Sequence, residues 1–268
     1  INVAREDIGS GYNQIIADLQ FASQYLPASS SIKIRASKQT ANALLARVFL
    51  YKKDFANAIV YASEVINSGN YSLLGNYADV FLDEETAESI FEVDFTALDR
   101  NRIAEYNFPL TMNGRREVAP AASLVNGYSQ NDARLNASIA FSGTEPYAIK
   151  YDDLSTGSDN FIVIRLAEMY LIRAEATAMQ NGDPLQIRND LNTIRVRSGL
   201  PVVNSSDIVV LLSGIESERQ LEFAFEGHRW FDLVRTGRAM ALIPTVSNIN
   251  KTLFPIPLSE LLSNTNPG

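Results

Sequence analysis

The fold of this chain is decided by the stretch from Asn42 to Gly69, which reads NALLARVFLYKKDFANAIVYASEVINSG. Apolar residues recur in it at steps of three and four, which predicts two amphipathic helices. Asp54 is a favourable N-cap for the second helix, and Gly69 is a typical residue at a helix end. Small residues allow close approach of the two helices; they are Ala43, Ala46, Ala56, Ala58 and Ala62. We therefore expect an antiparallel helix hairpin.

Helical periodicity extends outward on both sides of this hairpin. One amphipathic helix is expected from Ser10 to Leu26, where a proline follows and disfavours helix in the residue before it. A second hairpin is expected from Leu166 to Gly199, with a break at NGDP in residues 181–184. Repeated hairpins of this size are typical of tetratricopeptide-like architectures. The expected fold is mainly α: tetratricopeptide-like helix hairpins in an alpha-alpha superhelix, with a long loop-rich insertion.

The chain has no low-complexity linker, so we expect a single domain with four parts. These parts are tetratricopeptide-like helices in 1–69, a loop-rich insertion in 70–160, C-terminal helices in 161–241 and an extended tail in 242–268. Pro255 and Pro257 predict the extended tail, because proline fixes its own backbone angle and lacks an N–H group.

The composition is that of an ordinary globular protein and excludes several functions. Of 268 residues, 46% are hydrophobic and 20% are charged, which is enough for a sizeable core. The formal net charge of -8, without a long basic run, makes nucleic acid an unfavourable ligand. The sequence contains no cysteine and one histidine, so we expect no disulfide, no metal site and no cofactor. No apolar run is long enough to cross a bilayer as a helix.

Charged residues are densest between Ile215 and Gly237, which reads IESERQLEFAFEGHRWFDLVRTG. On helical spacing an apolar stripe continues into charged positions, so these charges are expected to be buried and paired. The expected structural ion network consists of Arg219, Glu222, Glu226, Arg229, Asp232 and Arg235. Within it Asp232 is three residues from both Arg229 and Arg235, a spacing that pairs side chains on a helix. We expect the charges just after Gly227 to be the partners of those before it, Glu222 and Glu226 included, and the network to fix two helices at an angle.

The same segment also permits an enzymatic interpretation. Glu222, Glu226, His228 and Asp232 could form an active site in which His228 is the base and Asp232 orients it. A hydrolase with paired carboxylates is the corresponding reaction class. We favour the structural interpretation and expect no catalytic residues, because aromatic side chains surround the charges. The segment also contains no phosphate-binding loop, nucleophile elbow or metal-ligand cluster.

Five blocks of the sequence resemble the C-terminal region of the SusD/RagB family, and they occur in the family's order. The blocks are RLAEMYLIRAEATA at 165–178, LNTIRVRSGL at 191–200, ER at 218–219, EFAFEGHRWFDLVRTG at 222–237 and LFPIPLSE at 253–260. The stretch from Asn42 to Gly69 is similar to the family's tetratricopeptide helices, so the resemblance spans nearly the whole chain.

The resemblance implies a non-enzymatic, surface-exposed lipoprotein of the outer membrane, of the Bacteroidetes type. Such a protein captures an oligosaccharide or another nutrient and delivers it to a TonB-dependent SusC-like transporter. Family members usually carry a signal peptide, a lipidated cysteine and a long N-terminal region. The chain begins at Ile1 and shows none of these, so it is expected to be a fragment or a shortened relative. Any membrane attachment would be through a lipid anchor upstream.

The stretch from Phe95 to Phe161 is the best candidate for a ligand site, because loops on a rigid scaffold commonly carry binding residues. Sugars are held by aromatic faces together with amide, carboxylate or guanidinium groups. The residues of these types that we expect to bind ligand are Tyr106, Asn107, Arg115, Tyr128 and Tyr147. The family resemblance provides no motif for these contacts, so residue type and location alone support them.

Two alternatives stay open at the level of sequence. Acidic runs at residues 83–85 and 152–153 could hold calcium, although neither has EF-hand spacing and solvated loop acids are the favoured interpretation. The helix hairpins could also present a concave face to a partner protein, in a tetratricopeptide-like interaction scaffold without sugar binding.

Overall fold

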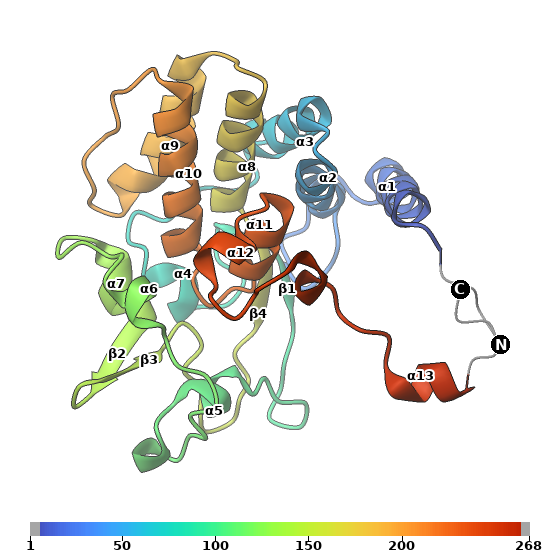
Figure 1. The fold of residues 1–268 in the computed structure, drawn as a ribbon. Helices are drawn as coiled ribbons and strands as arrows, with labels where there is room; N and C mark the ends of the chain where they lie inside the picture. The colour runs from blue at the N-terminus through green and yellow to red at the C-terminus, as the bar shows by residue number, and fades with distance from the viewer. Residues whose placement is uncertain (1–5, 264–268) are drawn as a thin grey trace.

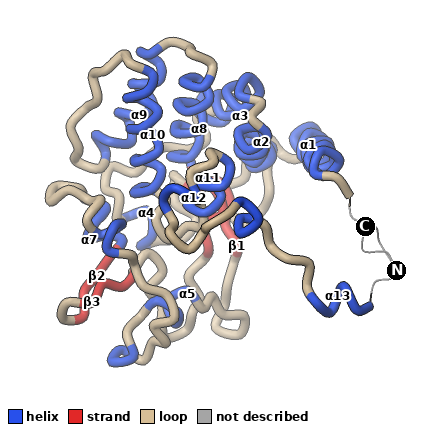
Figure 2. The backbone as a smooth tube through the Cα atoms, viewed as in Figure 1, coloured by secondary structure: helices blue, strands red, loops and turns tan. Residues whose placement is uncertain are grey.

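The structure is a computed structural model that describes residues 6–263. Its long helices stand side by side, while loops and short elements fill the part of the molecule below them (Figures 1 and 2). The long helices are α1 (Ile8–Tyr25), α2 (Lys38–Lys52), α3 (Phe55–Asn67), α8 (Leu166–Met179), α9 (Pro184–Arg197) and α10 (Ile208–Glu222). This confirms the predicted mainly helical fold of tetratricopeptide-like hairpins.

The first hairpin, α2 and α3, forms for the local reasons visible in its sequence. Ser37 and Thr40 make a reciprocal capping box at the start of α2. Lys53 ends α2 in the left-handed region, with φ of 64°, and turns the chain back. The Asp54 carboxylate then accepts a hydrogen bond from the Asn57 N–H group at 3.2 Å and caps α3. The hairpin predicted between Asn42 and Gly69 is therefore confirmed.

Helix α8 is the centre of the packing. One side of it, including Met169 and Ile172, packs into a core shared with α2 and α3. The opposite side, including Leu171 and Ala174, packs into a second core shared with α9 and α10. Because apolar residues surround it, α8 is buried almost all round, as expected for a helix between two cores.

The insertion between the hairpins contains mostly loops and short elements. The short helices are α4 (Asp79–Leu82), α5 (Ile103–Asn107), η1 (Leu110–Met112), α6 (Ala122–Val125) and α7 (Ala133–Ser138). Strand β1 (Ser89–Val93) pairs antiparallel with β4 (Phe161–Arg165), and β2 (Ile139–Ser142) pairs antiparallel with β3 (Glu145–Ala148). The β1–β4 pair connects the two ends of the insertion and places Arg165 directly before α8.

The C-terminal part differs from the expected extended tail. After α11 (Arg229–Arg235) and α12 (Ala239–Leu242), the chain forms η2 (Ile249–Thr252) and a terminal helix, α13 (Leu258–Ser263). The Pro257 carbonyl accepts hydrogen bonds from the Glu260 and Leu261 N–H groups. Residues 254–257, which contain Pro255 and Pro257, form no helix or strand, but a helix follows them because a proline that forbids a helix interior is well tolerated just before the first turn. Residues 264–268 of the predicted tail lie outside the described residues.

Within residues 6–263, no helix combines the length and the apolar character needed to cross a membrane.

Candidate functional site

Two predicted ligand residues, Tyr106 and Arg115, meet at the surface of the insertion. Tyr106 lies on α5, and the loop after η1 folds back along this helix. The Arg115 N–H group donates to the Glu105 carbonyl at 2.6 Å, and the Glu117 N–H group donates to the Tyr106 carbonyl at 2.9 Å. These bonds place the Arg115 guanidinium over the Tyr106 ring, 5.1 Å from its centroid. The exposed Arg115 side chain and the half-buried Tyr106 ring thus form one aromatic and cationic surface.

Gly114 allows the loop to fold back this closely. A Cβ atom at this position would lie 2.2 Å from the Phe108 carbonyl oxygen, and backbone atoms cannot yield as a flexible side chain would. The Gly114 N–H group also donates to the Pro109 carbonyl at 3.0 Å. The position of Arg115 over Tyr106 therefore depends on the missing side chain of its neighbour.

Carboxylates border the Tyr106–Arg115 surface. Glu105 lies 3.4 Å from Arg115 and 3.1 Å from Arg102, and Glu117 also pairs with Arg115. The Glu117 charge raises the pKa of Arg115 above its ordinary value. The surface therefore offers a flat aromatic ring, guanidinium donors and carboxylate acceptors together, which is the set of groups that sugar hydroxyls and C–H faces require.

The other three predicted ligand residues are buried and have partners inside the protein. The Asn107 side-chain amide donates to the Ile103 carbonyl at 2.8 Å. Tyr147 packs its ring edge-on against Phe108, with centroids 5.0 Å apart, beneath the Tyr106 loop. Tyr128 follows α6 and lies elsewhere, beside the end of α10, where its hydroxyl donates to the Leu221 carbonyl at 2.9 Å. Burial also raises the pKa of Tyr128. These three residues are therefore not included in the proposed site.

The acidic runs accept hydrogen bonds from backbone N–H groups. The Glu84 carboxylate accepts from the Asn160 N–H group at 3.3 Å, and the Asp153 carboxylate accepts from the N–H groups of Ser155 at 3.0 Å and Thr156 at 2.8 Å. Among residues 6–263, no group of three or more acidic, histidine or cysteine side chains is placed to hold a metal ion.

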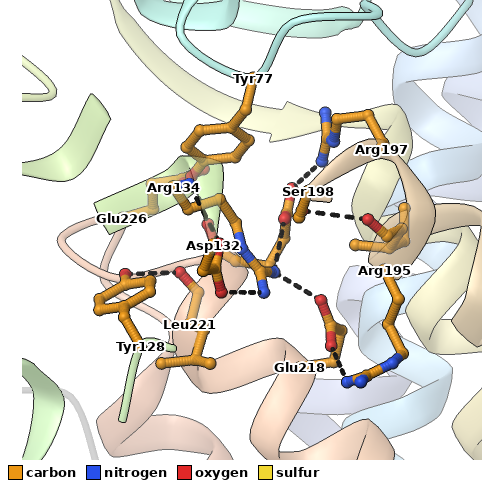
Figure 3. A network of polar contacts seen from close by, with 12 residues as sticks. Tyr77, Tyr128, Asp132, Arg134, Arg195, Arg197, Ser198, Glu218, Leu221 and Glu226 are labelled. Carbon is orange, nitrogen blue, oxygen red and sulfur yellow. Dashed lines mark hydrogen bonds and ion pairs between the residues drawn. The ribbon is translucent and has the colours of Figure 1, made fainter. Parts of the chain in front are cut away.

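Glu222 is the centre of a buried ion network at the end of α10. Figure 3 labels Arg134, Arg197 and Glu226 of this network. The Glu222 carboxylate pairs with Arg165 at 2.6 Å, with Arg134 at 3.1 Å and with Arg197. These cations hold the pKa of Glu222 far below its usual range, although burial alone would raise it. Because Glu222 is 0% exposed, its charge is compensated entirely by protein groups.

Glu226 extends this network toward the insertion. Its carboxylate accepts from Arg165 at 2.8 Å and from the Lys150 ammonium at 2.7 Å. Burial lowers the pKa of Lys150 to about 8, and the attraction of Glu226 opposes this shift. The network thus joins α10, β4 and the loop after β3.

A second group of charges links α10 to α11. Asp232 accepts from the Arg219 Nε atom at 2.9 Å and lies 2.7 Å from an Arg235 nitrogen. Arg235 also pairs with Glu175 of α8. The structure thus brings Arg219, Asp232 and Arg235 together and fixes two helices as expected. The prediction that Arg229 pairs with Asp232 was wrong, because Arg219 and Arg235 bind the Asp232 carboxylate instead.

Arg229 instead faces Glu216 of α10, with the two charged groups 3.4 Å apart and partly exposed. The expectation that the charges after Gly227 would partner Glu222 and Glu226 was also wrong. Their partners come from earlier segments, namely Arg134, Lys150, Arg165 and Arg197. Arg165 and Arg197 lie within the quoted family blocks, so the sequence did mark these two positions. Residue spacing along one helix could not show that they pair with Glu222.

His228 belongs to a third buried group of charges, which includes Glu168 of α8. Its Nδ1 atom lies 3.9 Å from the Glu168 carboxylate, which also accepts two hydrogen bonds from Arg47 at 2.6 and 2.8 Å. Burial lowers the pKa of His228 to about 4. The cations around Glu168, Arg47 first, lower its pKa to about 2 against the opposing effect of burial. His228 is therefore neutral at pH 7 and Glu168 is charged.

Comparison with known proteins finds a match to one protein family over the C-terminal part of the chain. Residues 147–266 match the model of the SusD family. We therefore place residues 147–266 in the SusD family. This confirms the resemblance found in the sequence, and the matched region contains Arg165, Arg197 and Glu222 of the buried network.

The rest of the chain is SusD-like as well. A SusD-like protein, P25, of Formosa agariphila is 27% identical over an alignment that covers 98% of this chain and 64% of that protein. A SusD-like protein from Bacteroides fragilis has the same fold, with a TM-score of 0.87 and 24% identity over 100% of this chain and 71% of that one. A laminarin-binding SusD-like protein has a TM-score of 0.80 and 28% identity over 98% of this chain and 70% of that one. The chain thus spans about two thirds of the length of these SusD-like proteins.

Proposed function

We propose that this chain is the glycan-binding part of a cell-surface nutrient-binding protein, which delivers its ligand to a TonB-dependent SusC-like transporter of the outer membrane. The observation that supports glycan binding is the partly exposed Tyr106–Arg115 surface, bordered by Glu105 and Glu117, on a loop of a rigid helical scaffold. The likeness to a laminarin-binding SusD-like protein supports the same ligand class. Attachment to the membrane would be by a lipid anchor outside this chain.

We propose that the protein has no catalytic activity of its own. A carboxylic acid that serves as a general acid needs a raised pKa, whereas the pKa values of Glu222 and Glu226 are lowered by buried arginines. Asp232 is likewise held at a pKa of about 2 by Arg219 and Arg235. These groups are therefore suited to a permanently charged structural role, and turnover of a chromogenic glycoside by the folded protein would contradict it.

Substitution of Tyr106 should separate binding from stability. Tyr106→Ala removes the ring on which Arg115 lies, and we expect affinity for the best glycan on an array that includes laminarin to fall by about tenfold or more. The melting temperature should change by no more than about 2 °C, because the side chain is partly exposed. Isothermal titration calorimetry measures the affinity.

Tyr25→Ala is the matched control, since this tyrosine is 65% exposed on α1, far along the chain from the loop. It should leave glycan affinity unchanged. Equal loss of affinity in both variants, or full affinity in Tyr106→Ala, would place the glycan elsewhere. If no glycan binds saturably to the unsubstituted protein, the interaction-scaffold alternative replaces the proposed function.

Substitution of Gly114 tests whether the folded-back loop matters. In Gly114→Ala the new methyl group would meet the Phe108 carbonyl, so the loop must shift and Arg115 must leave the Tyr106 ring. We expect glycan affinity to fall at least as far as in Tyr106→Ala, while thermal unfolding stays cooperative. Gly75→Ala provides a control glycine in the insertion, because its Cβ position is open and its backbone does not adopt a positive φ. Unaltered affinity in Gly114→Ala would contradict the proposed geometry.

A further inference from the structure

A cavity of about 610 Å³ lies on the helical part of the molecule, where the α2–α3 turn and the end of α8 meet α10 and α11. None of the insertion residues of the proposed glycan surface line it. Aliphatic side chains form part of its lining; they are Leu50, Met179, Val209, Leu212 and Ile215. Its volume falls within the range of natural ligand pockets, about 300–1,000 Å³. The cavity is therefore large enough to receive side chains of another molecule.

Positive charge is in excess around this cavity. Five cationic residues line it against three carboxylates, although the whole chain carries a net charge of -8. The cations are Lys53, Arg219, Arg229, Arg235 and Arg238, and the carboxylates are Glu175, Glu216 and Asp232. A local surplus of this kind attracts anionic groups.

Several of these donors have unused hydrogen-bonding capacity. Arg219 is 2% exposed and donates to Asp232 from its Nε and Nη2 atoms, but its buried Nη1 atom has no hydrogen-bond partner among residues 6–263. Arg229 and Arg238 share the single carboxylate of Glu216, at 3.4 and 3.1 Å. A buried donor without a partner is costly, so an incoming acceptor would be stabilised here.

The apolar groups around the cavity favour a polypeptide over a sugar. The apolar residues of its lining are aliphatic except for Phe55, whereas sugars need flat aromatic faces with several acceptors. Two apolar side chains of its lining extend to the surface: Val209 on α10 is 75% exposed and Met179 on α8 is 45% exposed. Apolar surface next to spare cationic donors is complementary to an acidic segment that carries large apolar residues.

We propose that this cavity binds a segment of a partner protein in which a large apolar side chain stands next to aspartate or glutamate. The apolar side chain would pack against Met179, Val209 and Leu212, which keep exposed surface at the cavity. The adjacent carboxylate would accept hydrogen bonds from the spare arginine donors, and Lys53 would add charge at the rim. The cavity is separate from the glycan surface, so peptide binding and glycan binding can each be lost without loss of the other.

An array of hexapeptides tests the proposal. It pairs Leu, Ile, Phe or Met with Asp or Glu, and it includes acidic peptides without apolar residues and apolar peptides with Lys or Arg. We expect selective capture of the acidic, apolar peptides by the full chain. In fluorescence polarisation, Ser213→Trp, which fills the cavity from α10, and Arg238→Glu should each weaken the best peptide by about tenfold or more.

Ser217→Trp and Arg188→Glu are the matched controls, because these residues lie on α10 and α9 and do not line the cavity. Both should bind the peptide like the unsubstituted chain, and all four variants should keep their glycan affinity. Absence of enrichment for acidic, apolar peptides, or undiminished binding by Ser213→Trp, would overturn the proposal. Loss of glycan binding alone would overturn only the proposed function.

Discussion

Glu222→Ala is expected to lower the free energy of unfolding by about 3–5 kcal/mol, which is the usual cost of removing one partner from a buried ion pair. This carboxylate contacts Arg134, Arg165 and Arg197. Without it, these three buried cations would lose part of the negative charge that compensates them. A loss of this size is a large part of the stability of an ordinary domain. Urea unfolding followed by circular dichroism measures it.

The control for this substitution is Glu145→Ala. Glu145 pairs with Arg116 at 3.3 Å, but its side chain is 63% exposed, so the change in stability should stay below about 1 kcal/mol. If Glu222→Ala proves no more damaging than Glu145→Ala, the buried network does not brace the helices. The enzymatic interpretation of these carboxylates would then need to be reconsidered.

Acid is expected to destabilise the protein in two steps. His228 has a pKa of about 4 in the folded state, below its ordinary value of 6.5, so the unfolded chain binds its proton first. Stability is therefore lost as the pH falls from 6.5 to 4, and this group alone accounts for roughly 3 kcal/mol. Glu168 and Asp232, each with a pKa of about 2, contribute stability that is lost between about pH 4.5 and 2.

Urea unfolding at a series of pH values between 7 and 3 measures this response. In His228→Asn the decline between pH 6.5 and 4 should be much smaller, while the steep decline below pH 4.5 should persist. Identical pH profiles for the two proteins would show that His228 is not buried as a neutral group. A profile that is flat down to pH 3 would contradict the buried carboxylates as well.

The helix hairpins could be predicted from the sequence because their signals are local. Asp54 caps α3 and the apolar periodicity of Asn42 to Gly69 lies within one segment, so no knowledge of distant contacts was needed. The short helix α13 was missed because Pro257 marks both an extended strap and a helix start. Only the hydrogen bonds that the Pro257 carbonyl accepts from the Glu260 and Leu261 N–H groups distinguish the two.

The charge network and the site could be predicted only in part. The burial of Glu222 was visible in the helical pattern, but its partner Arg134 is 88 residues away in sequence and becomes a neighbour only through the fold. Residue type alone could not separate Tyr106, which reaches the surface, from Tyr128 and Tyr147, which are buried. Tyrosine suits both situations, because its ring packs and its hydroxyl can donate to a buried carbonyl.

The Tyr106 loop rests on a small apolar cluster of its own, formed around Ala104, Phe108 and Tyr147, apart from the two cores that meet at α8. Mutations in this loop therefore need not disturb the packing of the long helices. In evolution, such an arrangement lets recognition residues diverge from one descendant to the next while the supporting architecture is inherited unchanged.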